Sequence, residues 1–305
     1  MIRLVAECGL QGGDRDQGAD VSATCIPSSA PPAPYVDTMP RVALLFTAAA
    51  AVVAAPSKRG LSAAHSPAHA ATFCADLAAA QTAGTLSWTY SWALSPPDES
   101  CGALRAVPFE PMIWGAKDAR NASGLWLSPQ TTHLLAFNEP NGKDQSNLTP
   151  AEAAALWPAV VAVARAHNLS LVAPVPSGTD TAWLDAFLAA CDGCVADVDV
   201  VALHPYSCTA AALKNALAAW GKFGKPLWVT EFNCGDGAKN ATAAEHLVWM
   251  KTALPILDAD ARIERYAWMS ARNDKVPGAA LFDGAGGAMT ALGRVYFSAG
   301  ASRLG

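Results

Sequence analysis

The sequence is poor in charge and has no cluster of basic residues. Asp, Glu, Lys and Arg make up 15% of the 305 residues, and the formal net charge is −5. Proteins that hold a phosphate backbone need grouped Lys and Arg side chains. We therefore expect no nucleic-acid partner.

The sequence also lacks the short motifs of several large enzyme classes. It contains no Walker loop and no Rossmann glycine fingerprint, so a nucleotide cofactor is not expected. It has no Gly-x-Ser-x-Gly elbow, which argues against a serine hydrolase of that type. The six histidines form no His-Glu-x-x-His pattern and no other metal-ligand spacing. The sequence therefore predicts neither a metal ion nor a cofactor.

The first 55 residues differ in composition from the rest. Residues 1–38 are polar and show no apolar periodicity, so we predict that they are disordered or not translated. Residues 39–55 have a short basic start and an apolar run of about 14 residues, which is the pattern of a secretory signal peptide. A membrane-spanning helix needs about 20 apolar residues, so we expect no stable membrane anchor. The protein is therefore predicted to be secreted, and extracellular or associated with a cell wall.

The rest of the chain is predicted to hold one catalytic domain. Residues 56–70 are rich in small residues and are predicted to be a linker. A single domain then covers residues 71–305, and we expect it to act as a monomer. Hydrophobic residues make up 52% of the chain, which is enough to close one large core.

Eight cysteines are present, and an oxidising compartment would favour disulfides. Cys191 and Cys194 are predicted to form a local disulfide, because no second Cys-x-x-Cys or His pair stands nearby to complete a zinc site. Cys208 and Cys234 follow neighbouring predicted strands, so we expect them to be bridged as well. Asn-x-Ser/Thr sequons also favour export. They begin at Asn121, Asn147, Asn168 and Asn240.

Short β-rich segments alternate with Ala-rich amphipathic segments along the predicted domain. This alternation predicts parallel strands joined by crossover helices. Capping boxes at Thr149–Glu152 and Thr242–Glu245 mark two helix starts. Eight strands are the number of a (β/α)8 TIM barrel, and we predict a single barrel. The predicted strands are Leu86–Trp92, Glu110–Trp114, His133–Asn138, Ser170–Val175, Val198–Leu203, Leu227–Glu231, Arg265–Met269 and Ala279–Phe282.

Two glutamates stand where predicted strands end. Glu139 follows an apolar run and lies in an Asn-Glu-Pro, and Glu231 ends a second apolar run. The catalytic residues of parallel barrels lie at this end of the strands. Cleavage of a glycosidic bond needs two carboxyl groups, one to protonate the leaving oxygen and one to meet the developing positive centre. The sequence therefore predicts Glu139 and Glu231 as catalytic.

Aromatic and polar residues at other strand ends are predicted to bind a sugar chain. Aromatic planes stack on the apolar faces of sugar rings, and Asn, His and Tyr side chains supply orienting hydrogen bonds. Because side chains alternate along a strand, some of these aromatic residues are expected to belong to the core instead. His204 lies where it could touch the substrate or orient a carboxylate. The predicted substrate-binding residues are Asn138, Trp88, Tyr90, Trp114, His204, Tyr206 and Trp268. Trp92, at the end of the first predicted strand, is also expected to lie near the sugar.

Several motifs together resemble the catalytic core of glycoside hydrolase family 128, which includes secreted endo-β-1,3-glucanases and wall-associated proteins of fungi and algae. The resemblance extends from about Cys74 to Tyr296. Asn-Glu-Pro occurs in many barrel glycosidases, so it is the ordered set that is specific. The motifs are Ser87–Trp92, Phe137–Pro140, Gln145–Pro150, Leu156-Trp157, Val200–Tyr206 and Trp228–Phe232.

The resemblance implies a retaining mechanism on β-glucan, with Glu139 as acid/base, Glu231 as nucleophile and Asn138 bound to the sugar 2-hydroxyl. For retention we expect the carboxyl groups about 5–5.5 Å apart, with the pKa of Glu139 raised by the neighbouring charge. Two departures from the family stand out. Pro205 replaces the usual Trp or Ile between His and Tyr, and related barrels carry the two glutamates on strands 4 and 7. The predicted strands place them on 3 and 6, which indicates a missed or merged strand.

Two other functions are compatible with the same residues. A glycan-binding or wall-structural protein could keep the barrel without catalysis, although the presence of both glutamates disfavours it. A transglycosylase would share every residue with the hydrolase and differ in how well its acceptor site excludes water. The glucan linkage and the choice between endo and exo action also stay open at this point.

Overall fold

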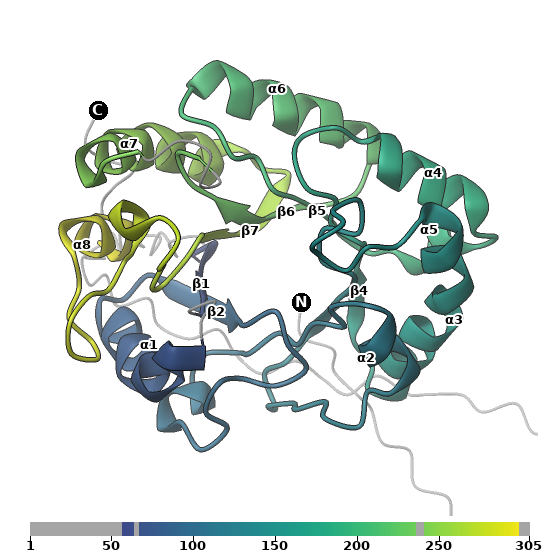
Figure 1. The fold of residues 1–305 in the computed structure, drawn as a ribbon, viewed down its shortest axis with the longest axis horizontal. Coiled ribbons are helices and arrows are strands. Elements are labelled where there is room, and N and C mark those ends of the chain that lie inside the picture. The colour runs from purple at the N-terminus through teal and green to yellow at the C-terminus, as the bar shows by residue number, and fades with distance from the viewer. Residues whose placement is uncertain (1–56, 64–66, 236–240, 299–305) are drawn as a thin grey trace, which may run out of the picture. The chain divides into compact units, whose positions relative to one another are not determined.

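The computed structural model describes residues 57–63, 67–235 and 241–298. Parallel strands lie in the interior and helices lie outside them (Figure 1). The strands are β1 (Arg59–Ser62), β2 (Leu86–Tyr90), β3 (His133–Leu135), β4 (Ser170–Val172), β5 (Val201–Leu203), β6 (Leu227–Phe232) and β7 (Ile263–Trp268). The α-helices are α1 (Phe73–Thr82), α2 (Ala116–Arg120), α3 (Pro150–Ala166), α4 (Ala182–Ala190), α5 (Cys194–Asp197), α6 (Ala210–Trp220), α7 (Ala243–Ala259) and α8 (Ala291–Phe297).

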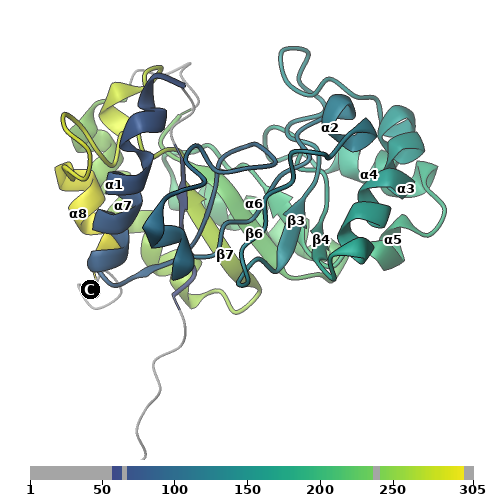
Figure 2. The same cartoon turned by 90° about the horizontal axis from the view of Figure 1, so that it is seen from below.

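The strands pair in parallel, as the alternation with helices predicts. β2, β1, β7, β6 and β5 form one sheet in that order, and β3 pairs with β4. Isolated parallel bridges connect the two sheets: Thr89 with Phe109, Met112 with Leu135, and Val172 with Val200. Seen from below, α1, α7 and α8 lie on one side of the strands and α2 to α5 on the other (Figure 2). The fold is thus a mixed α/β fold built on parallel strands.

The first strand was missed in the sequence because it carries no apolar alternation. β1 reads Arg-Gly-Leu-Ser and lies within the predicted linker 56–70, yet all four residues are buried. The structure therefore corrects the linker prediction, since β1 pairs with β2 on one side and β7 on the other. Its neighbours, not its own composition, account for its burial.

Two of the predicted strands differ in the structure. Glu110–Trp114 is extended but contributes only isolated bridges. Residues 279–282 form no parallel strand, because a 3-10 helix covers Pro277–Ala279 and Phe282 pairs antiparallel with Met289. With β1 and the bridged segment 109–112 counted in chain order, Glu139 follows the fourth extended segment and Glu231 lies in the seventh. In this count the two glutamates belong to segments 4 and 7, the strand numbers that the family resemblance implies.

The long helices begin where their capping boxes predict. The side chains of Thr149 and Thr242 accept hydrogen bonds from the backbone N–H of Glu152 and Glu245, and each glutamate accepts one from the backbone N–H of its threonine. Such reciprocal bonds satisfy N–H groups that the first turn leaves unpaired. These caps set where α3 and α7 start.

A buried ion pair occupies the end of the strands where β3 begins. Glu110 is fully buried and accepts hydrogen bonds from Arg265 Nη1 at 2.5 Å, the backbone N of Thr132 at 3.0 Å and that of His133 at 2.8 Å. The guanidinium of Arg265 lies 4.5 Å from the ring centroid of Trp228. Burial raises the pKa of Glu110, but the hydrogen bonds from His133 and the charge of Arg265 lower it to about 2. Glu110 is thus an ionised carboxylate at ordinary pH.

Three disulfides are present among the described residues. Cys191–Cys194 and Cys208–Cys234 confirm the two predicted pairs, and Cys74–Cys101 is the third. The sequon residues Asn121, Asn147 and Asn168 are exposed. The predicted signal peptide 39–55, residues 1–38 and the Asn240 sequon lie outside the described residues. The described helices include none with the length and apolar character needed to cross a bilayer.

Candidate active site

Glu139 is placed where the chain turns sharply out of the sheet. The apolar run that begins in β3 continues through Phe137, which is fully buried. The backbone N of Glu139 donates to the carbonyl of Val175 at 2.8 Å, and Glu139 itself has a left-handed φ of 42°. Non-glycine residues in this region are uncommon and occur often at functional sites. The turn leaves Glu139 9% exposed at the end of the strands.

Glu231 stands near the end of β6 and is 4% exposed. Two donors hold its carboxylate, one on each oxygen. The indole Nε1 of Trp92 donates to Oε1 at 2.7 Å, and the hydroxyl of Tyr206 donates a short hydrogen bond to Oε2. The first donor follows β2 and the second follows β5, so the loops after two other strands fix this carboxylate.

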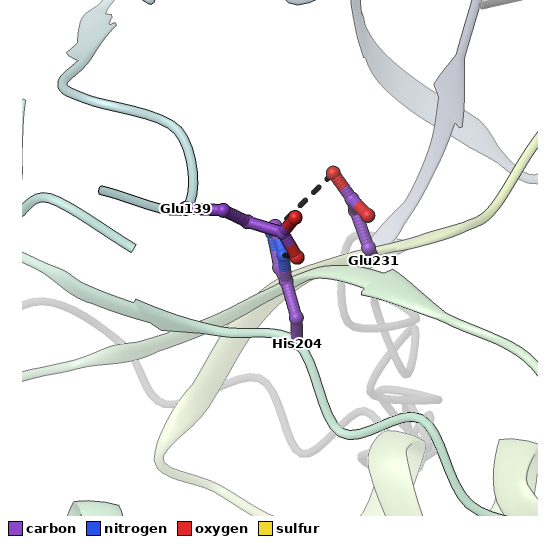
Figure 3. A group of neighbouring side chains, drawn as sticks. All are labelled: Glu139, His204 and Glu231. Carbon is purple, nitrogen blue, oxygen red and sulfur yellow. Dashed lines mark hydrogen bonds and ion pairs between the residues drawn. The ribbon is translucent and has the colours of Figure 1, made fainter. Parts of the chain in front are cut away.

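His204 connects the two carboxylates and is fully buried. Its Nδ1 lies 2.9 Å from Oε1 of Glu139, and its Nε2 lies 2.9 Å from the hydroxyl oxygen of Thr230 and 3.5 Å from Oε1 of Glu231. Figure 3 shows the three side chains converging from separate segments of the chain. The imidazole therefore touches both acidic groups without being exposed itself.

The three groups are also close enough to be considered as metal ligands. One atom each of Glu139, His204 and Glu231 lies within 4.8 Å of the others, which includes one oxygen of each carboxylate. However, both nitrogens of His204 already face protein oxygens, and both oxygens of Glu231 already accept hydrogen bonds. A metal ion would have to displace these partners. The donor set fits proton exchange between His204 and the carboxylates better than metal ligation.

The charges in the site stabilise one another. Burial raises the pKa of Glu139, but hydrogen bonds from His204 and Ser177 and the charge of His204 outweigh burial and lower it. Burial lowers the pKa of His204, but the charge of Glu231 and the hydrogen bond with Glu139 outweigh burial and raise it. The prediction of a raised pKa for Glu139 is therefore wrong for the free site. The ion pair with His204, which the sequence did not reveal, is the reason.

A cleft of about 220 Å³ opens over the two glutamates. Among the predicted site residues, Asn138, Glu139, Trp114, Tyr206 and Glu231 line it. Asn138 is 4% exposed, and its Oδ1 is buried without a hydrogen-bond partner. An unpartnered buried acceptor in a cleft wall is costly unless a ligand satisfies it. The cleft therefore combines two carboxyl groups, an indole ring and an unsatisfied amide oxygen.

The other predicted aromatic contacts lie elsewhere. Trp88, Tyr90 and Trp268 are 0% exposed and do not line the cleft. Trp88 packs against Trp228, and the indole of Trp268 donates to the carbonyl of Ala279 at 2.7 Å. The prediction that these three side chains bind sugar is wrong, because strands of this fold are buried on both faces and an aromatic residue near a strand end can still point into the core.

Several residues that line the cleft were missed in the sequence. They come from loops that follow strands, as catalytic residues of such folds do. Trp92 was not missed: it is one of the aromatic residues expected near the sugar, and it lines the cleft two residues beyond β2. Asn233 lies two residues beyond Glu231, a position that could have suggested it. The remaining missed residues are Gln145, Ser177, Gly235, Met269, Asn273, Lys275 and Val276.

Comparison with known proteins gives consistent matches. The model of the family described as glycosyl hydrolase catalytic core matches residues 67–296. A crystal structure of a family 128 (subgroup II) endo-β-1,3-glucanase from Sorangium cellulosum is 36% identical, covers 80% of this chain and 98% of its own, and superposes with a TM-score of 0.68. A family 128 (subgroup I) endo-β-1,3-glucanase from Amycolatopsis mediterranei, in a complex with laminarihexaose, is 28% identical with a TM-score of 0.63 and coverage of 80% and 100%.

A curated relative extends the comparison to fungi. Alkali-sensitive linkage protein 1 of Schizosaccharomyces pombe is 28% identical over 192 residues, which are 60% of this chain. The match spans 35% of the length of that relative.

Proposed function

Because this chain belongs to the glycosyl hydrolase catalytic core family, and within it to glycoside hydrolase family 128, we propose that it is a retaining endo-β-1,3-glucanase. The observation that carries the proposal is the pair of buried glutamates with carboxylate oxygens within 4.8 Å of each other at the floor of a cleft. Retaining glycosidases have carboxyl groups about 5–5.5 Å apart, whereas inverting enzymes leave about 6.5–9.5 Å for a water molecule.

We further propose that the strands close into one (β/α)8 barrel. The parallel bridges of segment 109–112 to β2 and β3, and of β4 to Val200, support this arrangement. Each extended segment would then have a neighbour on both sides. In such a barrel the chain segments after the fourth and seventh strands face the same opening, which explains how Glu139 and Glu231 come together.

In the first step, an oxygen of Glu231 attacks the anomeric carbon while the bond from that carbon to the leaving oxygen breaks. Glu139 gives its proton to the leaving oxygen, so the products are a glycosyl ester on Glu231 and a free glucan end. In the second step, water attacks the anomeric carbon, Glu139 takes a proton from it, and the ester bond breaks. Both glutamates are restored.

The proton that Glu139 needs comes from His204. We place the proton of the free site on the imidazole, because the neighbouring groups lower the pKa of Glu139 and raise that of His204. A bound glucan removes water from the cleft and so disfavours separated charges more than a neutral pair. The proton then moves from Nδ1 of His204 to Oε1 of Glu139 across the 2.9 Å hydrogen bond. Substrate binding thereby converts Glu139 into an acid.

Asn138 and the aromatic rings position the substrate. The unpartnered Oδ1 of Asn138 accepts a hydrogen bond from the sugar 2-hydroxyl beside Glu231. The half-buried ring of Trp114 provides an apolar plane for a neighbouring sugar ring. A β-1,3-linked glucan is the proposed substrate, because the relatives that match most of the chain are β-1,3-glucanases.

Product analysis tests this proposal. The enzyme should release oligosaccharides from β-1,3-glucan and leave β-1,4-glucan intact, and NMR of the first product should show the β-anomer. Endo action predicts a rapid fall in viscosity with a range of product lengths. A first product in the α-configuration would contradict retention, and longer products than substrates would indicate a transglycosylase. A purified, glucan-binding protein without any cleavage would favour the non-catalytic alternative.

The two roles can be separated by substitution. Glu231→Ala should abolish turnover, and azide should restore it as a glycosyl azide of inverted anomeric configuration, because the anion enters from the nucleophile's face. Glu139→Ala should slow substrates with poor leaving groups most, since an activated aryl glycoside hardly needs the acid. Full activity in either variant would exclude the assigned site.

We also propose that the protein works outside the cell or in a cell wall. Three disulfides support this, because such bonds form and persist mainly in oxidising compartments. Fractionation of the native host followed by detection of the protein in medium, wall and cytosol tests the location. Detection in the cytosol with free thiols would contradict it.

A further inference from the structure

Trp92 makes a contact with Glu231 that packing alone does not require. Its indole Nε1 lies 2.7 Å from Oε1 of the carboxylate, and its side chain lines the cleft. Trp92 also adopts a left-handed φ of 53°. Bulky residues rarely take this conformation, and residues that do so cluster at functional sites. The chain departs from its preferred geometry at the residue that reaches Glu231.

The surroundings of Trp92 hold the indole in this direction. Its ring meets the ring of Tyr90 edge to face, with centroids 5.0 Å apart. The hydroxyl of Tyr90 donates to the carbonyl of Thr230 at 2.7 Å, one residue before Glu231. The loop is also closed by a hydrogen bond from Ser91 Oγ to the carbonyl of Ser95 at 2.9 Å. The segment that carries the indole is therefore tied to the strand that carries Glu231.

We propose that Trp92 is a positioning residue that aims the carboxylate of Glu231 at the anomeric carbon through its indole N–H. This inference rests on the proposed function. An indole N–H can only donate, so it keeps the same hydrogen bond whatever the protonation of its neighbours. The hydroxyl of Tyr206 can both donate and accept, and His204 can change tautomer. Among these three side chains, only Trp92 is restricted to donating a hydrogen bond.

The indole N–H of Trp92 acts together with the hydroxyl of Tyr206. Trp92 donates to Oε1 of Glu231 and Tyr206 donates to Oε2. Because both oxygens are held, the carboxylate cannot rotate freely about its last bond. A nucleophile held in its attacking orientation reacts faster than one that must be oriented in each encounter. The ring also forms part of the cleft wall, so a simple stacking role predicts a different kinetic effect. That difference makes the inference testable.

The test uses Trp92→Phe, which removes the N–H and keeps an aromatic face. An activated 2-deoxy-2-fluoro-laminaribioside traps the glycosyl ester, so its saturating rate constant reports attack by Glu231 directly. We expect this rate constant and kcat to fall roughly 10- to 100-fold, as for loss of one hydrogen bond to a charged group, with KM changed much less. Trp92→His, which restores an N–H donor, should recover part of the rate.

Two comparison variants separate orientation from stacking and from general damage. Trp126→Phe makes the same chemical change outside the cleft and should leave the trapping rate unchanged. Trp114→Phe, which changes a cleft ring that donates no hydrogen bond to either glutamate among the described contacts, should act mainly on KM. Thermal melting of each variant shows whether it is folded.

The outcomes distinguish the inference from the function on which it rests. If wild-type protein is not labelled on Glu231 and cleaves no β-1,3-glucan, the proposed function fails. If wild type is labelled and folded Trp92→Phe is labelled at the wild-type rate with only KM raised, Trp92 is a stacking residue and the inference alone is overturned.

Discussion

Two buried glutamates lie near opposite ends of β3 and differ in the partners that surround them. Glu110 is held by the guanidinium of Arg265 and by backbone N–H groups, and the imidazole of His133 lies 3.9 Å from its carboxylate. Glu139 is held by an imidazole and a hydroxyl, and it opens into a cleft. Both carboxyl groups have a lowered pKa, yet only Glu139 combines an imidazole at 2.9 Å with a place in the cleft wall.

The comparison shows that burial and a lowered pKa do not by themselves identify a catalytic acid. The pKa of Glu110 is lowered to about 2, yet Glu110 does not line the cleft over Glu139 and Glu231. The features that separate Glu139 are an imidazole within direct hydrogen-bond distance, an opening above it and a second carboxylate within 4.8 Å.

The largest expected effect is the loss of turnover when Glu139 is substituted. Glu139→Gln keeps a hydrogen-bonding group beside His204 but cannot transfer a proton. We expect kcat on β-1,3-glucan to fall roughly 10²- to 10⁴-fold, which is the usual contribution of a general acid. The melting temperature should stay close to that of wild type. A variant that unfolds without losing turnover per folded molecule would show that Glu139 is structural.

The matched substitution of Glu110 should lower the free energy of unfolding. Glu110→Gln leaves the partly exposed guanidinium of Arg265 without its carboxylate. The loss of stability should therefore stay below about 3–5 kcal/mol, which is the cost of breaking a fully buried pair. Denaturant unfolding measures this loss. Turnover per folded molecule should match wild type, as determined by titration with the trapping reagent. A large fall in turnover of the folded variant would erase the distinction between the two ends.

The pH dependence of stability sharpens the comparison further. The pKa of Glu110 falls from 4.5 in the unfolded chain to about 2 in the fold, so its contribution is present above pH 4.5 and is lost as the pH falls toward 2. The shift corresponds to about 3 kcal/mol. Unfolding free energies between pH 5 and pH 2 should therefore fall less for Glu110→Gln than for wild type. Parallel curves for the two proteins would contradict the assignment.

His204 contributes in the opposite direction. Its pKa is raised in the fold, so its contribution is present below its unfolded pKa of 6.5 and is lost as the pH rises through its folded pKa. The Glu139 end thus loses the contribution of His204 as the pH rises and that of Glu139, whose pKa is lowered, as the pH falls.

The smallest expected effect concerns aromatic rings. Trp114→Ala removes an apolar plane from the cleft and should raise KM for long β-1,3-glucans by about tenfold, a stacking contribution of about 1–1.5 kcal/mol. KM for a trimer should change less, because stacked subsites bind sugars away from the cleaved bond. Kinetics on polymer and trimer measure the ratio. Equal changes on both substrates would place the ring in the core, like Trp88.

Much of the site could be predicted because its signals are local. An apolar run that is followed by a glutamate predicts a strand with a carboxyl group at its C-terminal end. This pattern located Glu139 and Glu231. The bridge between Cys208 and Cys234 was also predictable, because each cysteine follows one of two neighbouring strands. These features depend on the order of residues within a few positions of one strand.

The features that could not be predicted depend on contacts far apart in the chain. Trp268 and Trp92 both stand at strand ends, and nothing in either segment shows that the first is buried and the second reaches Glu231. The ion pair of Glu139 with His204 joins residues 65 positions apart. β1 is short and begins with a buried arginine whose partners include Tyr266 and Asp258. Each of these depends on partners that only the fold brings near.

The position of β1 decides where a shortened form of this protein can begin. A recombinant product that starts at residue 71, the domain boundary suggested by composition, would lack the strand that lies between β2 and β7. Both of those strands would then present unpaired backbone N–H and C=O groups, which are templates for aggregation. A product that starts at residue 57 retains all four residues of β1. Insoluble material from the shorter design would therefore reflect a deleted strand and not a defect in the catalytic machinery.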